Sequence, residues 1–168
     1  MAYDVLIDPG HGGKDSGAVN SASGILEKNL NLDAASSLNF YLQQRNVTTA
    51  YTRTTDVYPE LNARTAQGIR EGAAIFVSVH HDTADGRALV YHDDKETSIR
   101  LANKVASYMG GIPVRSMTES RFGRLYIADF TTGPSILIEV GPTRFYTRDE
   151  RIARVQPAAN AISDFLGK

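Results

Sequence analysis

The feature that most constrains the fold is an alternation of short apolar runs with segments of helical periodicity. Runs rich in β-branched residues are expected to form buried strands at residues 3–7, 47–51, 74–79 and 136–140, with weaker candidates at 88–91 and 125–127. Strands that alternate with helices favour a parallel sheet covered on both faces. We therefore predict an α/β fold: a single domain over residues 1–168, with a mainly parallel or mixed central sheet and helices on both faces.

Helical periodicity marks the segments between these runs. Apolar residues share one helical face over 30–42, and another set shares a face over 101–109. A third helix is expected over about 59–70. A last helix is expected from near Pro157 to Leu166, because proline favours the start of a helix over its continuation. Residues 110–130 are polar and interrupted by glycine, so we expect a substrate-facing loop there.

Composition excludes several classes of function. The 18 Lys and Arg residues nearly balance the 19 Asp and Glu residues, which leaves no basic field for a polynucleotide. The absence of cysteine excludes disulfides and thiolate nucleophiles, although sites of histidine and carboxylate stay open. The longest uncharged apolar run, 73–79, is far below the ~20 residues of a membrane helix. We expect no nucleic-acid partner, no membrane span and no obligate protein partner.

The segment VLIDPGHGGKDSGA, residues 5–18, leads from an apolar strand into a glycine-rich loop that carries His11. A phosphate-binding loop of the form G-x-x-x-x-G-K-[ST] is excluded, because Asp8 replaces its first glycine and Asp15 its Ser or Thr. The glycines are instead expected to clear space around a ligand-binding side chain. Ligands of open α/β sheets bind beyond the carboxyl ends of the strands, and His11, His80 and Glu139 all lie at such ends.

His80 and His81 end an apolar strand, so only one of the two side chains can face a given crevice. A single histidine in that place is more often an ordinary polar residue than a ligand. Glu27 lies where a loop meets a helix, and alone it would be attributed to the helix dipole.

Glu139 ends another apolar strand, where a carboxylate needs a cation, a metal or several hydrogen-bond donors. One interpretation is a buried ion pair with Arg53 or Arg64. The other is a carboxylate held beside a reacting water.

Taken together, His11, Glu27 and His80 supply two imidazoles and one carboxylate. This donor set suits a catalytic zinc ion whose fourth position is left to water. The site would carry a formal charge near +1, which lowers the pKa of bound water to about 7 and polarises a carbonyl. We therefore predict one Zn²⁺ per chain, with Glu139 as the general base.

Six segments resemble, in chain order, the zinc-dependent N-acetylmuramoyl-L-alanine amidases of the Amidase_3 type: IDPGHGGKDSGA, EKNLNLDAASSLNFYLQQRNV, YTRTTD, LNAR, FVSVHHD and SILIEVG. The resemblance covers nearly the whole chain, and it implies that His11, Glu27 and His80 are the zinc ligands and Glu139 the catalytic glutamate. Arg64, in LNAR, matches an arginine that is either structural or substrate-positioning.

The resemblance implies hydrolysis of the amide between N-acetylmuramic acid and L-alanine in bacterial peptidoglycan. The alternatives are a zinc hydrolase of another wall bond, either peptide or N-acetyl, and a non-catalytic wall-binding module. Two positions depart from the family pattern: Asp82 stands where asparagine is usual, and Pro142 where phenylalanine is usual. The departures bear on the substrate cleft and the subfamily, and the roles of His81 and Asp82 stay open.

The start MAYDVLID lacks the pattern of a Sec-type signal. We expect action at the bacterial cell wall, either after release from a host cytoplasm as a phage endolysin or after secretion as the catalytic domain of a longer autolysin. The phage origin is slightly favoured.

Overall fold

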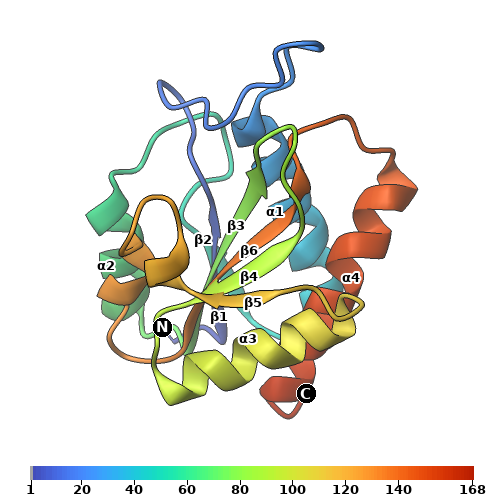
Figure 1. Cartoon of the computed structure of the whole chain (residues 1–168). Helices are drawn as coiled ribbons and strands as arrows, with labels where there is room; N and C mark the ends of the chain where they lie inside the picture. Colours follow the sequence, from blue (N-terminus) through green and yellow to red (C-terminus); the bar gives the residue numbers. More distant parts are fainter. Residues whose placement is uncertain (1) are drawn as a thin grey trace.

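The structure is a computed structural model that describes residues 2–168 (Figure 1). Its elements are, in order, β1 (Val5–Pro9), α1 (Glu27–Gln43), β2 (Thr49–Tyr51), α2 (Leu61–Glu71), β3 (Ile75–Asp82), β4 (Leu89–His92), α3 (Glu96–Tyr108), β5 (Val114–Ser116), the 3₁₀ helices η1 (Met117–Glu119) and η2 (Tyr126–Asp129), β6 (Ser135–Pro142) and α4 (Arg148–Phe165). None of the helices described in residues 2–168 is long and apolar enough to cross a membrane.

The strands form one six-stranded sheet in the order β2-β1-β3-β6-β4-β5. Strand β1 is parallel to β2 and β3, and β3 is parallel to β6. Strand β4 runs antiparallel to β6, with β5 parallel to β4 at the edge. The predicted α/β domain with a mixed sheet is confirmed.

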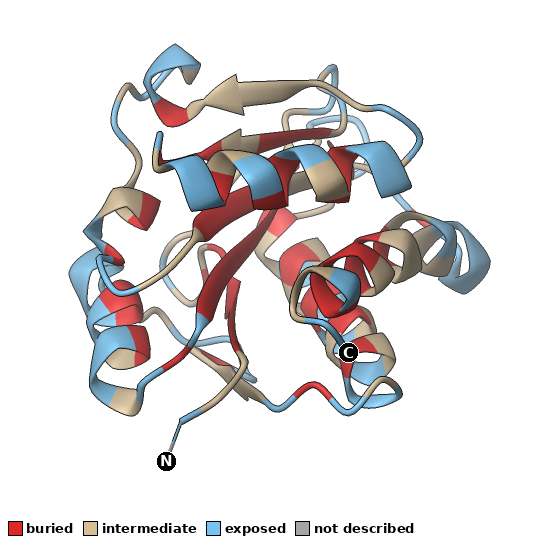
Figure 2. Ribbon diagram, turned by 90° about the horizontal axis from the view of Figure 1, so that it is seen from below, coloured by how far each residue is buried: buried red, intermediate tan, exposed pale blue. Residues whose placement is uncertain are grey.

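The two faces of the sheet bury different residues because side chains alternate along each strand. Val5, Ile7 and Val77 belong to the larger core, which α1, α3 and α4 cover. Leu6 and Phe76 face the other way, into a smaller core closed by α2 and η2. Figure 2 shows the buried residues on the sides of the helices that face the sheet.

The prediction for the last helix is wrong about its start. Helix α4 begins at Arg148, and Pro157 lies inside it. A capping box at the N-terminus, in which Thr147 and Glu150 each bind the other's backbone N–H, specifies the earlier start. Proline inside a helix costs about 3 kcal/mol, a cost that burial of the apolar face of α4 against α1 and α3 offsets.

The predictions for residues 47–51, 110–130 and 125–127 are also inaccurate in part. Residues 125–127 are not a strand, because the backbone there turns into η2. The second strand covers only Thr49–Tyr51, and the expected loop 110–130 contains the short strand β5. Edge strands of this length bury little side-chain surface, so the apolar pattern that identifies central strands is weak in them.

Candidate metal centre and catalytic cleft

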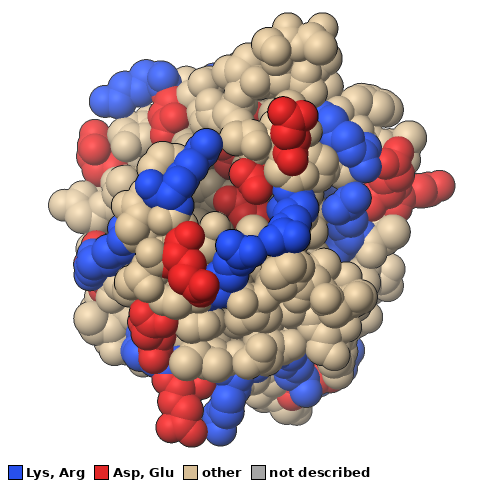
Figure 3. All heavy atoms as spheres, viewed as in Figure 1, with Lys and Arg blue, Asp and Glu red and all other residues tan. Residues whose placement is uncertain are grey.

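A cleft of about 730 Å³ lies beyond the carboxyl ends of β1, β3 and β6. His11, Glu27, His80 and Glu139 all line it. Figure 3 shows acidic atoms in a hollow on this face, with Lys and Arg side chains beside it. The structure thus brings the four predicted site residues into one cleft, although the chain separates them widely.

The glycine-rich loop after β1 provides the space for this arrangement. A Cβ atom on Gly10 would lie 2.3 Å from the ring of His80, and one on Gly17 would lie 2.5 Å from Oε2 of Glu27. Neither position tolerates a side chain. His11 itself adopts a left-handed φ of 60°, which is unusual outside glycine and is typical of functional sites.

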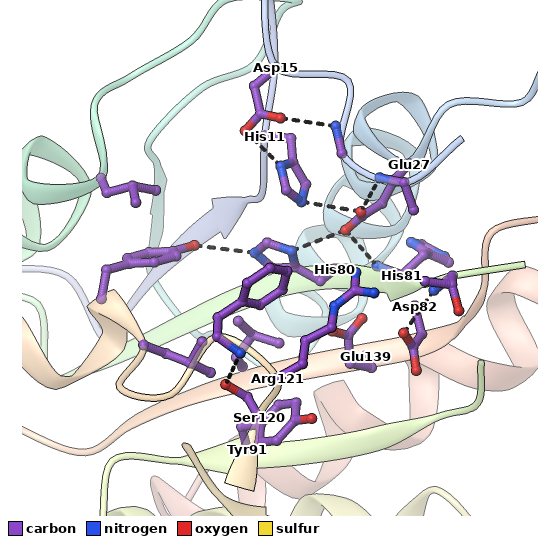
Figure 4. Close-up of a pocket in the computed structure, with 18 of the residues that line it drawn as sticks. His11, Asp15, Glu27, His80, His81, Asp82, Tyr91, Ser120, Arg121 and Glu139 are labelled. Atoms are coloured by element: carbon purple, nitrogen blue, oxygen red, sulfur yellow. Dashed lines mark hydrogen bonds and ion pairs between the residues drawn. The ribbon is translucent and has the colours of Figure 1, made fainter. Parts of the chain in front are cut away.

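Glu27, in the first turn of α1, bridges the two histidines (Figure 4). Its Oε2 atom lies 3.1 Å from Nε2 of His11, and its Oε1 atom lies 3.0 Å from Nδ1 of His80. One ligand atom from each of the three residues fits within a spread of 4.8 Å. Ligand atoms around a tetrahedral zinc are about 3.4 Å apart, so the cluster has the size and the donor types of a zinc site.

The second nitrogen of each histidine is also engaged. Nδ1 of His11 lies 2.7 Å from Oδ2 of Asp15, and Nε2 of His80 lies 3.3 Å from the hydroxyl of Tyr126. The Tyr126 hydroxyl donates to the buried carboxylate of Asp8, so its oxygen is left to accept the Nε2 proton of His80. Asp15 and Tyr126 therefore orient the two imidazoles so that the other ring nitrogen of each faces Glu27, as partners of metal-binding histidines do.

Asp15 and Tyr126 were missed as site residues by the sequence reasoning. Asp15 stands four residues after His11, a spacing that could have identified it as the partner of Nδ1. Tyr126 lies in a segment that was predicted to be a strand, and nothing in its neighbours' pattern points to His80.

The charges of the cluster are strongly coupled. Burial opposes protonation of His11, but hydrogen bonds and charges of Glu27 and then Asp15 outweigh it and raise the pKa of His11. Burial alone would raise the pKa of Glu27, yet its bonds to His11 and His80 hold that pKa far below the usual range. The carboxylate of Glu27 therefore stays ionised at neutral pH, where it can bind a cation.

Glu139 lies on β6 as the direct neighbour of His80 on β3. Its Oε2 atom is buried and has no hydrogen-bond partner among residues 2–168. Burial, with the negative charges of Glu27 and Asp82, raises the pKa of Glu139 well above its usual range, and Arg121 opposes the rise. A carboxylate in this state favours a proton, which is the property of a general acid or base.

The alternative partners proposed for Glu139 are engaged elsewhere. Arg53 donates to the carbonyls of Pro9 and Gly10, at 3.0 and 2.8 Å. Arg64 is buried and pairs with Asp8 at 3.0 Å. The interpretation of Glu139 as half of a buried ion pair with Arg53 or Arg64 is therefore wrong.

Arg64 also donates to the carbonyl of His11 at 2.9 Å. It thus ties the loop that carries His11 to the buried carboxylate of Asp8, and it is absent from the lining of the cleft formed by the described residues. These contacts are structural and give Arg64 no surface for substrate.

His81 and Asp82 have separate surroundings. His81 is buried, its Nδ1 lies 2.9 Å from Oδ1 of Asn31, and burial lowers its pKa to about 3. Asp82 accepts the backbone N–H groups of Thr83 and Arg87, at 2.7 and 3.4 Å. His81 is a neutral core residue, and Asp82 shapes the loop at the rim of the cleft.

These features define an α/β protein that has the donor set of a metal-dependent hydrolase beside a buried glutamate. The family described as N-acetylmuramoyl-L-alanine amidase, Amidase_3, matches residues 5–163. The chain belongs to this family.

Curated relatives are longer than this chain. The N-acetylmuramoyl-L-alanine amidase LytC of Bacillus subtilis is 29% identical over 176 residues, which cover 95% of this chain and 34% of LytC. The probable cell wall amidase LytH of Staphylococcus epidermidis is 32% identical over 143 residues, which cover 82% of this chain and 47% of LytH. The chain therefore spans about a third to a half of the length of these two relatives.

Two solved structures share the fold over nearly their whole length. The catalytic domain of the N-acetylmuramoyl-L-alanine amidase CwlV from Paenibacillus polymyxa has a TM-score of 0.85 at 28% identity, with 97% of each chain covered. The N-acetylmuramoyl-L-alanine amidase AmiC2 of Nostoc punctiforme has a TM-score of 0.81 at 28% identity, covering 100% of this chain and 98% of AmiC2.

Proposed function

We propose that this chain hydrolyses the amide bond between the lactyl group of N-acetylmuramic acid and the L-alanine of the peptidoglycan stem peptide. The observation that carries this proposal is the cluster of His11, Glu27 and His80 beside the buried carboxylate of Glu139, in a chain of the Amidase_3 family. The described domain would be one catalytic unit that acts at the bacterial cell wall, and the longer relatives leave its further surroundings open.

We propose that Nε2 of His11, a carboxylate oxygen of Glu27 and Nδ1 of His80 hold one Zn²⁺. The donor set and the ring orientations that Asp15 and Tyr126 impose both support this assignment. When bound there, zinc would polarise the scissile carbonyl and lower the pKa of a bound water to about 7.

Glu139 would take a proton from the attacking water and return it to the departing amine of L-alanine. Water supplies the oxygen of the new lactyl carboxylate, and the C–N bond breaks as the nitrogen gains the proton. The position of Glu139 supports this role, because the residue lines the cleft next to His80 and no described residue pairs with its buried Oε2. A nearby divalent cation would counteract the rise in the pKa of Glu139, so that it could start the reaction as a base.

The first test is digestion of purified peptidoglycan with and without a chelator, followed by mass spectrometry of the products. Amidase action exposes the amine of L-alanine and a lactyl carboxylate while the glycan stays intact. New peptide termini or released acetate would point to the rival hydrolases. Wall binding with no chelator-sensitive product would indicate a binding module and contradict the proposal.

A further inference from the structure

A loop between η1 and η2 overhangs the cleft with two arginines and a phenylalanine. Arg121, Phe122 and Arg124 all line the cleft, and the ring of Phe122 is 74% exposed. Figure 4 shows the Arg121 side chain reaching from this loop over the cleft, toward Glu139 and the histidine cluster. None of the roles assigned above uses this loop.

Arg121 differs from its neighbour in having no acidic partner. Arg124 pairs with Asp129 at 2.6 Å, whereas no carboxylate among residues 2–168 lies within ion-pair distance of Arg121. Asp82, which lines the same cleft, is engaged by the backbone N–H groups of Thr83 and Arg87. The Arg121 guanidinium contacts the ring of Phe122, 4.7 Å away, and its N–H groups remain available to a ligand.

The rest of the cleft is acidic. Asp15, Glu27, Asp82 and Glu139 all line it, and Arg121 and Arg124 are the only Lys or Arg residues among the described residues of its lining. A guanidinium can bind a carboxylate through two parallel hydrogen bonds, and it is well suited to recognise one. The unpaired cation therefore points to an anionic group on the molecule that enters this cleft.

The substrate of the proposed reaction carries such a group close to the scissile bond. The residue after L-alanine in a stem peptide is D-glutamate, linked through its side chain so that its α-carboxylate is free, or the corresponding amide. Arg121 lies near the reacting centre, since it lines the same cleft as Glu139 and its side chain reaches toward Glu139 and the histidines (Figure 4). A carboxylate one residue beyond the scissile amide is thus favoured over more distant ones.

We infer that Arg121 binds the free α-carboxylate of the residue that follows L-alanine, with Phe122 packed against the same part of the stem peptide. The inference rests on the proposed amidase function and adds a substrate preference to it. Peptides with D-glutamate at this position are cleaved better than those with D-isoglutamine, in which the carboxylate is amidated.

The test uses two soluble disaccharide tripeptides that end in L-lysine amide and differ only in D-glutamate or D-isoglutamine at the second position. We expect wild-type kcat/KM to be about two- to fivefold higher for D-glutamate, mainly through KM, as for a partly exposed ion pair. Arg121→Gln removes the preference, so that the ratio of the two kcat/KM values falls to about one. Arg121→Lys keeps part of the preference. The matched control Arg124→Gln removes a charge from the same loop and keeps the preference.

Equal rates on both peptides in the wild type would overturn the inference. The same holds if the preference persists in Arg121→Gln, or if that variant slows both peptides equally, which would show an effect through Glu139 instead. Zinc content and thermal stability measured on every variant establish that it is folded and loaded. Cleavage of neither peptide by the zinc-loaded wild type would contradict the amidase proposal itself.

Discussion

His80 and Glu139 are direct neighbours across the parallel strands β3 and β6. Paired residues in such strands direct their side chains to the same face of the sheet, so a proposed metal ligand and a proposed general base enter the cleft together. The chemistry proposed for the cleft depends on this strand register. The roles of the metal ligands and of the general base can be tested by separate experiments.

Glu139→Gln should leave zinc bound and remove most hydrolysis. The amide keeps the shape of the side chain but cannot accept the proton of the attacking water, and loss of a general base costs about 10²- to 10⁴-fold in rate. The measurement is kcat on purified peptidoglycan, with zinc content by atomic absorption. Full activity in this variant would remove Glu139 from the mechanism.

His80→Ala should reduce bound zinc to well below one ion per chain, because it deletes the imidazole whose Nδ1 faces Glu27. His81→Gln is the matched control: the Nδ1 of His81 contacts Asn31 and the residue is not part of the ligand cluster, so zinc content should stay at one. Loss of zinc from His81→Gln with retention in His80→Ala would reverse the assignment of the two histidines.

Tyr126→Phe should weaken zinc binding about tenfold or more, the usual effect of losing a hydrogen-bond partner of a metal-binding histidine. Ser78→Ala is the control, because Ser78 also bonds to Asp8 and to the Tyr126 hydroxyl but has no contact with His80. Competition with a chromophoric chelator gives the dissociation constants. Equal affinities for the two variants would indicate a structural role alone for Tyr126.

Zinc affinity should fall with decreasing pH from above pH 6.5, the ordinary pKa of histidine, because the pKa of metal-free His11 is raised and zinc must displace its proton. Asp15→Asn removes one cause of the raised pKa. The pH at which affinity begins to fall should therefore move lower in this variant. Chelator competition at a series of pH values measures the shift, and an unchanged profile would contradict the role of Asp15.

Arg64→Leu should destabilise the fold by about 3–5 kcal/mol, because it leaves the carboxylate of Asp8 buried without its ion-pair partner. Denaturant unfolding measures this loss, and Asp8→Asn in the same chain should recover part of it. If Asp8→Asn restores stability to Arg64→Leu, the loss comes from the unpaired charge of Asp8. If the losses of the two substitutions add, the loss comes from packing.

The ion pair of Asp8 with Arg64 also makes the stability of the fold depend on pH. Burial alone would raise the pKa of Asp8, but the charge of Arg64 and hydrogen bonds from Thr52, Tyr126 and Ser78 outweigh it and lower the pKa below 3.8. The ionised carboxylate therefore stabilises the fold above pH 3.8, and this contribution is lost as the pH falls through the folded-state pKa.

The sequence alone was sufficient for the central strands, the α/β class and the family. Val5 to Ile7 and Ile136 to Ile138 are apolar on both faces, which only a strand buried between helices explains. His11, Glu27, His80 and Glu139 could be predicted as site residues because each lies in a local motif at the end of a strand or the start of a helix.

Tertiary structure decided the rest, because the relevant partners are distant in the chain and chosen by packing. It directed Arg64 to Asp8 and away from Glu139, and it placed the hydroxyl of Tyr126 between Asp8 and His80. It also let α4 continue through Pro157, since the buried face of that helix offsets the local cost of proline. Each of these outcomes depends on the free energy of the whole packed fold, which cannot be deduced from any single segment of the sequence.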